Sequence, residues 1–262
     1  MLGEELMKLF LNKIGRKAFH FIGLEVHRYV SSEHPITYFR SNNYLRHNAR
    51  RLEHLASLQI PVRGMTVLEV GAGIGDHSHY YIDRECKITI TEARPDNLEY
   101  LKTRFPGYNV QFLDLEHPAP LPNGPFDIIH CYGLLYHLGN PEETLTYLSQ
   151  VCAKMLFLET CVSFGDKREI NLVKEDENSL TQSYSGKGCR PTRIWLFEKL
   201  RELYGFVYVP RTQPNHEEFP LDWTNPEKHG NRLSRAVFIA SRERIDNPIL
   251  SSSLLDHQIR HE

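Results

Sequence analysis

Hydrophobic and polar residues alternate along most of the chain with two periods, one typical of strands and one typical of helices. Short runs rich in Val, Ile, Leu and Phe predict buried strands at residues 65–70, 87–93, 109–115, 126–133, 155–160, 206–210 and 235–241. Apolar residues three and four positions apart predict helices at residues 44–58, 95–105, 141–155 and 192–205. Strands that alternate with helices form parallel βαβ units, so the pattern predicts an α/β protein with a doubly wound sheet.

The two ends of the chain differ from this middle part. We expect a helical extension or cap over residues 1–60, a main domain over residues 61–244, and a C-terminal tail without clear periodicity over residues 245–262. Within the main domain, residues 160–234 contain the longest stretches between predicted elements. Connections of this length are uncommon unless they carry a function, so we expect them to cover a binding site.

The N-terminal segment 6–30 carries apolar residues at roughly helical spacing with lysines and arginines between them. The charges interrupt any hydrophobic core of a signal peptide, so we do not expect a secretory leader. A cationic amphipathic helix of this kind can lie on an anionic membrane surface. The more common alternative is that its apolar stripe packs on the domain or on a second subunit. The sequence does not fix the oligomeric state.

Composition and charge narrow the class of protein. Apolar residues make up 40% and charged residues 24% of the 262 residues, which excludes a mostly disordered chain. The 31 basic and 33 acidic residues give a net charge of −2, from which we expect no nucleic-acid partner. Five scattered cysteines form no CxxC pair, which favours a reducing cytoplasm over a disulfide framework.

A glycine-rich turn follows the first predicted strand, in the sequence VLEVGAGIGD at residues 67–76. Glycine allows the unusual backbone angles and the close approach to a ligand that such a turn needs. The turn does not fit the dinucleotide pattern GxGxxG, because the sixth position is Asp76, and no GK pair of a P-loop follows. Glu69 would repel a pyrophosphate, so it favours a ligand with a positively charged amino group.

With these residues the chain resembles the class I S-adenosylmethionine-dependent methyltransferases. VLEVGAGIG matches their first motif, and Glu92, Asp114 and the segment FDIIHCYGLLYHL match the next three in order and spacing. The resemblance implies a Rossmann-like sheet of seven strands with helices on both faces. It also implies S-adenosyl-L-methionine as cofactor, S-adenosyl-L-homocysteine as product, and no metal.

The resemblance assigns cofactor-binding roles residue by residue. Glu92 is expected to bind the ribose hydroxyls, Asp114 and the backbone of Leu115 the adenine, and Cys131 and Tyr132 to flank the sulfonium. The other expected cofactor residues are Glu69, Gly71, Gly73, Asp76 and His77.

The acceptor side is expected outside the carboxyl ends of the strands, where ligands of open α/β sheets bind. As general base we consider His216 first, because an imidazole titrates near neutral pH, and then His137 and Glu159. Expected acceptor-binding residues are Tyr136, Tyr184, Arg190, Glu217, Phe219 and Trp223. Each of them also has an ordinary structural interpretation, as a core, capping or surface residue.

Two kinds of acceptor remain open. A histidine, acids and aromatics in the segment HEEFPLDW favour methyl transfer to O or N of a small molecule or sugar-containing metabolite. The alternative is a methyltransferase of tRNA or another macromolecule, because the YHL segment and the Trp-bearing helix at residues 192–205 resemble a branch that modifies the tRNA wobble uridine. The net charge leads us to expect the first.

Overall fold

The structure is a computed structural model, and it describes residue 37 and residues 39–177, 182–183 and 185–262. The predicted cationic helix at residues 6–30 and the candidate residue Tyr184 lie outside the described residues. None of the helices in the described ranges is long and apolar enough to cross a membrane.

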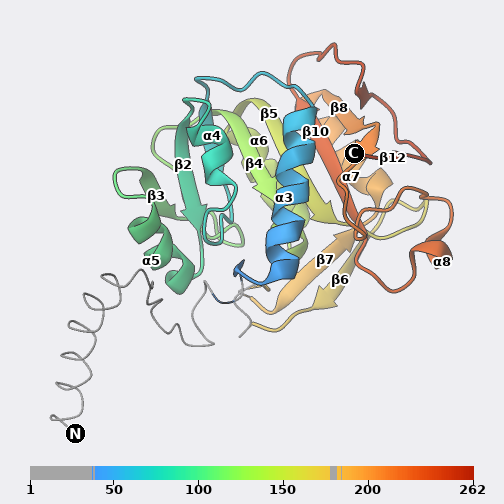
Figure 1. Cartoon of the computed structure of the whole chain (residues 1–262), viewed down its shortest axis with the longest axis horizontal. Helices are drawn as coiled ribbons and strands as arrows, with labels where there is room; N and C mark the ends of the chain where they lie inside the picture. Colours follow the sequence, from blue (N-terminus) through green and yellow to red (C-terminus); the bar gives the residue numbers. More distant parts are fainter. Residues whose placement is uncertain (1–36, 38, 178–181, 184) are drawn as a thin grey trace, which may run out of the picture.

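A central sheet of eight strands carries the fold (Figure 1). Its strands are β1 (Thr66–Glu69), β2 (Lys87–Glu92), β3 (Asn109–Phe112), β4 (Phe126–Tyr132), β5 (Cys152–Cys161), β8 (Phe206–Pro210), β10 (Arg235–Ser241) and β11 (Leu250–Ser251). Their order is β11-β8-β10-β5-β4-β1-β2-β3. The strands from β3 to β5 run parallel, whereas β10 is antiparallel to both β5 and β8. The predicted α/β fold with a doubly wound sheet is confirmed, but the sheet has eight strands instead of the expected seven, because the C-terminal residues add β11.

Helices cover both faces of this sheet. They are α3 (Asn42–Ser57), α4 (Ser78–Ile82), α5 (Pro95–Arg104), α6 (Pro141–Gln150), α7 (Arg193–Tyr204) and the short α8 (Pro226–His229). One core layer joins α3, α4 and α5 to side chains such as Val67 and Ile128, and the other joins α6 and α7 to Leu68 and Ile129. Neighbouring strand residues therefore serve opposite layers, as the two-residue period of a strand requires.

Local signals set the helix ends. Pro95 and Pro141 occupy first helical positions, where the missing N–H is not needed. The hydroxyl of Thr192 caps α7 by accepting the backbone N–H of Trp195, and Gly205 ends that helix with a positive φ of 92°.

The structure departs from the sequence expectations in three places. The helix expected at 141–155 ends at Gln150, because β5 begins at Cys152. Within the long connection after β5, strands β6 (Ile170–Lys174) and β7 (Lys187–Pro191) form an antiparallel pair. The expected loose tail instead supplies β11 to the sheet and β12 (Ile259–Arg260), which pairs with β9 (Thr212–Gln213).

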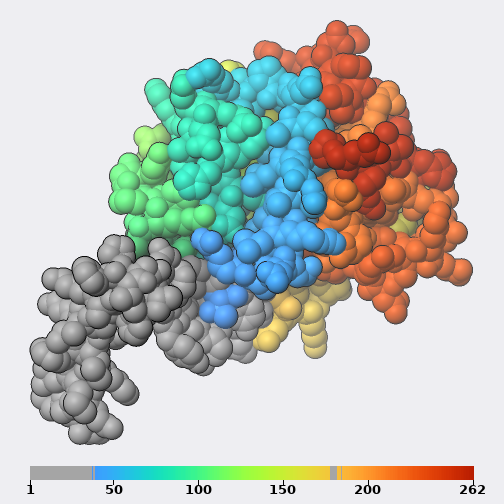
Figure 2. Space-filling model, in the orientation of Figure 1, coloured from blue at the N-terminus to red at the C-terminus, as the bar shows by residue number. Residues whose placement is uncertain are grey.

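Helix α3 lies across one face of the sheet (Figure 1). In Figure 2 it forms a blue band, with green and cyan residues on one side and the orange and red C-terminal part on the other. We expected Leu45 and Ala49 to lie on its buried face, but both are exposed. The buried face instead carries polar side chains, namely His47, Asn48, Arg51 and His54, together with Leu55. A buried polar stripe on a helix indicates that it borders a site rather than only a core.

Candidate active site

A cavity of about 330 Å³ opens where the glycine turn after β1, the ends of β2 and β4, and helix α3 meet. Most of the expected cofactor residues line it: Glu69, Gly71, Gly73, Asp76, His77, Glu92, Asp114, Leu115 and Tyr132. The cavity lies at the carboxyl ends of the parallel strands, which is where the fold class predicts it.

The glycine turn approaches its surroundings closely. Gly71 and Gly73 have φ angles of +63° and +59°, a region that side-chain-bearing residues rarely adopt. A Cβ atom at Gly71 would lie 2.7 Å from Cδ1 of Leu134. The turn therefore needs glycine for its backbone angles and for the space beside Leu134.

Glu69 lies at the end of β1 and is almost fully buried. Burial raises the pKa of its carboxyl to about 7, although the hydroxyl of Ser78 donates a hydrogen bond of 2.5 Å that opposes the shift. A carboxyl that titrates near pH 7 inside a cavity can switch to the charged form when a cation binds beside it. This agrees with the expectation of a ligand with a charged amino group.

Glu92, at the end of β2, accepts three backbone N–H groups. Its Oε2 accepts from Gly73 at 2.7 Å, and its Oε1 accepts from Ala93 and Arg94 at 2.9 Å each. Burial raises the pKa of Glu92, and these hydrogen bonds oppose that rise. Glu92 thereby ties the glycine turn to the next strand and presents its carboxylate at the cavity wall.

Two aspartates border the cavity at its rim. Asp76 is held by Arg104 at 2.6 Å and by the side-chain amide of Asn48 at 3.3 Å, so it links the turn to α3 and α5. Asp114 accepts the backbone N–H of Glu116 at 2.9 Å, which fixes the loop after β3. Both carboxylates are therefore held in place at the wall.

Several buried polar atoms of the cavity wall lack a hydrogen-bond partner among the described residues: His77 Nε2, Asn97 Oδ1 and Tyr132 Oη. Buried polar atoms are normally paired, so their presence indicates that a polar ligand belongs in this cavity. The residues thus fit a nucleoside-type cofactor. Cys131 differs from the expectation, because it does not line the cavity and packs with the opposite core layer. It alternates along β4 with His130 and Tyr132, which face the cavity side.

The other end of the cavity contains a buried ion network that the sequence analysis missed. Glu159 on β5 accepts from Arg51 of α3 at 2.5 Å and from Arg235 of β10 at 3.1 Å. Arg235 also donates to the hydroxyl of Tyr136 at 3.2 Å and to Glu218 at 2.5 Å. Arg51, Arg235 and Tyr136 line the cavity, whereas Glu159 lies behind them. The network therefore joins α3 to the sheet and places two guanidinium groups at this end of the cavity.

The three candidate bases have different positions. His137 lines the cavity, and its Nδ1 is hydrogen-bonded to Glu175. Glu159 is fully buried and bound to two arginines. His216 is buried behind His47, with their ring centroids 4.5 Å apart, and is not a lining residue. Of the three, His137 alone lines the cavity.

Among the residues that the structure describes, the other acceptor candidates are, apart from Tyr136, engaged elsewhere. Phe219 is fully buried in the core, so it offers no stacking surface. Trp223 packs against Arg193, 4.0 Å from its ring centroid, and donates to Gln258 at 2.7 Å. Arg190 donates to the backbone carbonyl of Tyr136 at 2.9 Å, and Glu217 forms an ion pair with Arg46. These interactions are structural, and only Tyr136 of this set lines the cavity.

Sequence comparison finds one matching family model and several similar proteins. A family model described as a methyltransferase domain matches residues 68–154. A tRNA U34 carboxymethyltransferase of Histophilus somni (strain 2336) is 27% identical over 216 residues, which cover 74% of this chain and 65% of that protein. The protein of the same name from Actinobacillus succinogenes is 27% identical over 217 residues, with the same coverage. The match thus spans about 65% of the length of these relatives.

Solved structures share the fold. The N-terminal domain of EvdMO1, solved in the presence of S-adenosylhomocysteine and D-fucose, has a TM-score of 0.57 and 19% identity, covering 74% of this chain and 82% of that one. An S-adenosylmethionine-dependent methyltransferase from Mesorhizobium loti has a TM-score of 0.54 and 14% identity, covering 75% and 100%.

Residues 68–154 thus match the model of a methyltransferase domain, and the fold agrees with that match, because solved methyltransferases share it. The expectation of a small-molecule or glycan acceptor without nucleic acid is wrong, because the similar curated proteins are named for tRNA. The net charge of −2 does not exclude a nucleic-acid partner, since it sums the whole chain and does not limit the charge around one site.

Proposed function

We propose that this protein modifies tRNA by transferring a group from an S-adenosyl sulfonium donor to a uridine of the anticodon. Similarity over 74% of the chain to proteins named tRNA U34 carboxymethyltransferase carries the proposal. A tRNA acceptor also agrees with a cytoplasmic location, for which the five cysteines, all free in the structure, are suited.

The cofactor half of the cavity supports this activity. When bound, S-adenosylmethionine supplies an electrophilic methyl group on a positively charged sulfur. Glu69, the glycine turn and Glu92 would hold its amino acid and ribose parts, and Asp114 with the Leu115 backbone its adenine. These residues are fixed by hydrogen bonds within the fold, so the donor is bound in one orientation, which favours transfer.

The acceptor half would orient the uridine and remove its proton. His137 is the proposed proton acceptor, because it lines the cavity and Glu175 fixes its ring. Burial lowers the pKa of His137, so the imidazole is neutral and able to accept a proton at pH 7. Arg51, Arg235 and Tyr136 provide donors toward oxygen atoms of the acceptor.

The experiment is a nucleoside analysis of modified tRNA. The full chain is incubated with bulk tRNA and either S-adenosylmethionine or the related donor that carries a carboxymethyl group on sulfur. The tRNA is then digested and its nucleosides are weighed by mass spectrometry. We expect one uridine to gain the mass of the donor's group, and the better donor identifies that group. The Gly71→Val variant is the control without cofactor binding. The proposal would be refuted if the protein binds S-adenosylhomocysteine but no tRNA nucleoside gains mass with either donor.

A further inference from the structure

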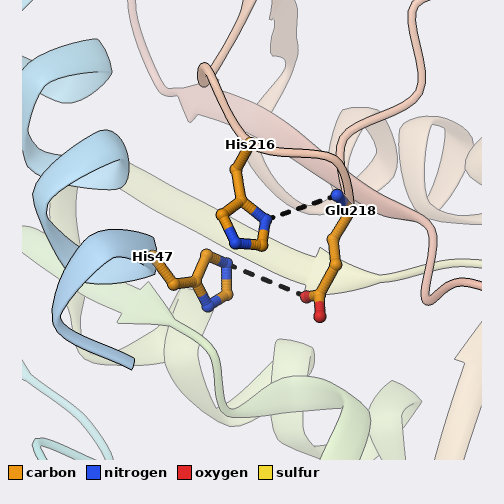
Figure 3. A group of neighbouring side chains, drawn as sticks. All are labelled: His47, His216 and Glu218. Atoms are coloured by element: carbon orange, nitrogen blue, oxygen red, sulfur yellow. Dashed lines mark hydrogen bonds and ion pairs between the residues drawn. The ribbon is translucent and has the colours of Figure 1, made fainter. Parts of the chain in front are cut away.

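A histidine pair and a carboxylate meet beside the acceptor end of the cavity, at a place that the proposed function does not use. His47 comes from α3, and His216 and Glu218 come from the loop between β9 and α8. Figure 3 shows the two imidazoles and the carboxylate turned toward one another. One nitrogen or oxygen atom of each residue lies within 4.8 Å of those of the other two.

Two nitrogen atoms of this cluster are buried and unsatisfied. His47 Nε2 and His216 Nε2 have no hydrogen-bond partner among the described residues. The side chains are 9% and 1% exposed, respectively. Buried polar atoms without a partner cost free energy, so two of them side by side call for an explanation, such as an ion that they bind.

The electrostatics keep both imidazoles neutral. Burial and the charges of Arg51 and Arg235 hold the pKa of His47 well below its usual range. Burial also lowers the pKa of His216. A neutral histidine offers a lone pair to a metal ion. Two imidazoles and one carboxylate are a ligand set that zinc and neighbouring transition metals prefer.

We propose that His47, His216 and Glu218 bind a divalent transition-metal ion of the zinc type. The Nε2 of His47 lies 3.9 Å from Oε2 of Glu218. A tetrahedral zinc ion separates its ligand atoms by roughly 3.4 Å, so binding requires the side chains to move closer together. The two imidazole planes, now 30° apart, also have to turn so that their lone pairs meet at the ion. Binding through Nε2 of His216 places its ring proton on Nδ1 and gives up the 3.3 Å hydrogen bond from the Glu218 backbone N–H.

The charges around the site can accommodate the ion. Arg235 binds Oε2 of Glu218, the oxygen that also faces His47, so the carboxyl group would have to share this oxygen or turn its other oxygen toward the metal. The two nearby arginines, Arg51 and Arg235, are matched by the carboxylates of Glu159 and Glu218. A further carboxylate is available, because Oε1 of Glu217 lies 3.8 Å from Nε2 of His216.

His47 lines the cavity, whereas His216 and Glu218 do not, so the ion would lie behind the cavity wall. It would hold α3 to the loop between β9 and α8, next to the acceptor end. The inference depends on these side chains alone and stands whether or not tRNA is the acceptor.

The test measures zinc binding by the full chain. Protein stripped with a chelator is titrated with ZnCl2 by calorimetry, and the visible absorption of a Co(II)-loaded sample reports the ligand geometry. We expect one ion per chain. Removing a group that only hydrogen-bonds to a ligand costs about 10–100-fold in metal affinity, so His47→Ala and His216→Ala should lose at least that much.

Two further variants keep the result interpretable. Glu218→Gln retains an oxygen for Arg235 but loses the charge, so we expect weaker zinc binding without loss of fold. His257→Ala removes an imidazole that is 70% exposed and outside the cluster, so it should bind zinc as the wild type does. Thermal melting and circular dichroism report the fold of each variant. A wild-type chain that binds no zinc at micromolar concentration, or folded cluster variants that bind it unchanged, would overturn the proposal.

Discussion

Replacing Glu159 with alanine should lower the stability of the fold, because this carboxylate has a structural role and is not a catalytic base. The carboxylate is fully buried and balances two buried guanidinium groups, Arg51 and Arg235. Removing one partner of a buried ion pair costs about 3–5 kcal/mol, because the other charge stays buried without compensation. For a chain of this size each kcal/mol lowers the melting temperature by about 2–4 °C, so we expect a drop of about 6–20 °C.

The assay is thermal and urea unfolding of the purified protein, followed by circular dichroism. Glu85→Ala is the matched control, because its pair with Arg63 is exposed and its loss should leave the melting curve unchanged. Glu159→Ala should also release α3 from β5, so the affinity for S-adenosylhomocysteine should fall together with stability. A Glu159→Ala protein that melts like the wild type but transfers no group would refute this reasoning and make Glu159 catalytic.

Three further predictions concern the cavity. Glu92→Ala should weaken S-adenosylhomocysteine binding by about 1.5–3 kcal/mol, the value of hydrogen bonds to a charged group, and a calorimetric loss below about threefold would place the ribose elsewhere. Burial raises the pKa of Glu69 to about 7, and the ammonium group of the cofactor favours the ionised carboxylate. The affinity for S-adenosylhomocysteine should therefore rise with pH up to about pH 7 and then level off. Glu69→Gln should show no such rise. His137→Ala should lower transfer to tRNA by about 10²–10⁴-fold with cofactor affinity unchanged, and Glu175→Gln should cause a smaller loss; a normal rate in His137→Ala would exclude it as the base.

Much of the fold could be predicted, because each core strand is a compact apolar run. The strand expected at residues 126–133 is found at Phe126–Tyr132, and the one expected at 235–241 is found at the same residues. The end of α6 was missed because Ala153, Lys154 and Met155 suit a helix as well as a strand. These residues form a strand because β5 pairs with β4 and β10, and the local sequence pattern does not predict such pairing.

Most of the residues expected to bind the cofactor do line the cavity, because they follow strand ends in a known motif. The acceptor half could not, since Arg51 and Glu159 are 108 positions apart and only the fold brings them together. One signal was available: His47, Arg51 and His54 share a helical stripe with Leu55, which marks a polar buried face. The apolar positions alone predicted a buried face with Leu45 and Ala49 at the start of this helix, but both residues are exposed.

The central claim, transfer from an S-adenosyl sulfonium donor to tRNA, is tested most directly by following the transferred group. The full chain is incubated with S-adenosylmethionine labelled on its methyl group, or with the related donor labelled on its carboxymethyl group. Bulk tRNA is the acceptor in one reaction and an RNA-free pool of metabolites and glycans in another. We predict label from one of the two donors in the tRNA, confined to a uridine of the anticodon, and none in the second pool. Label in the metabolites or glycans, with unlabelled tRNA, would contradict it.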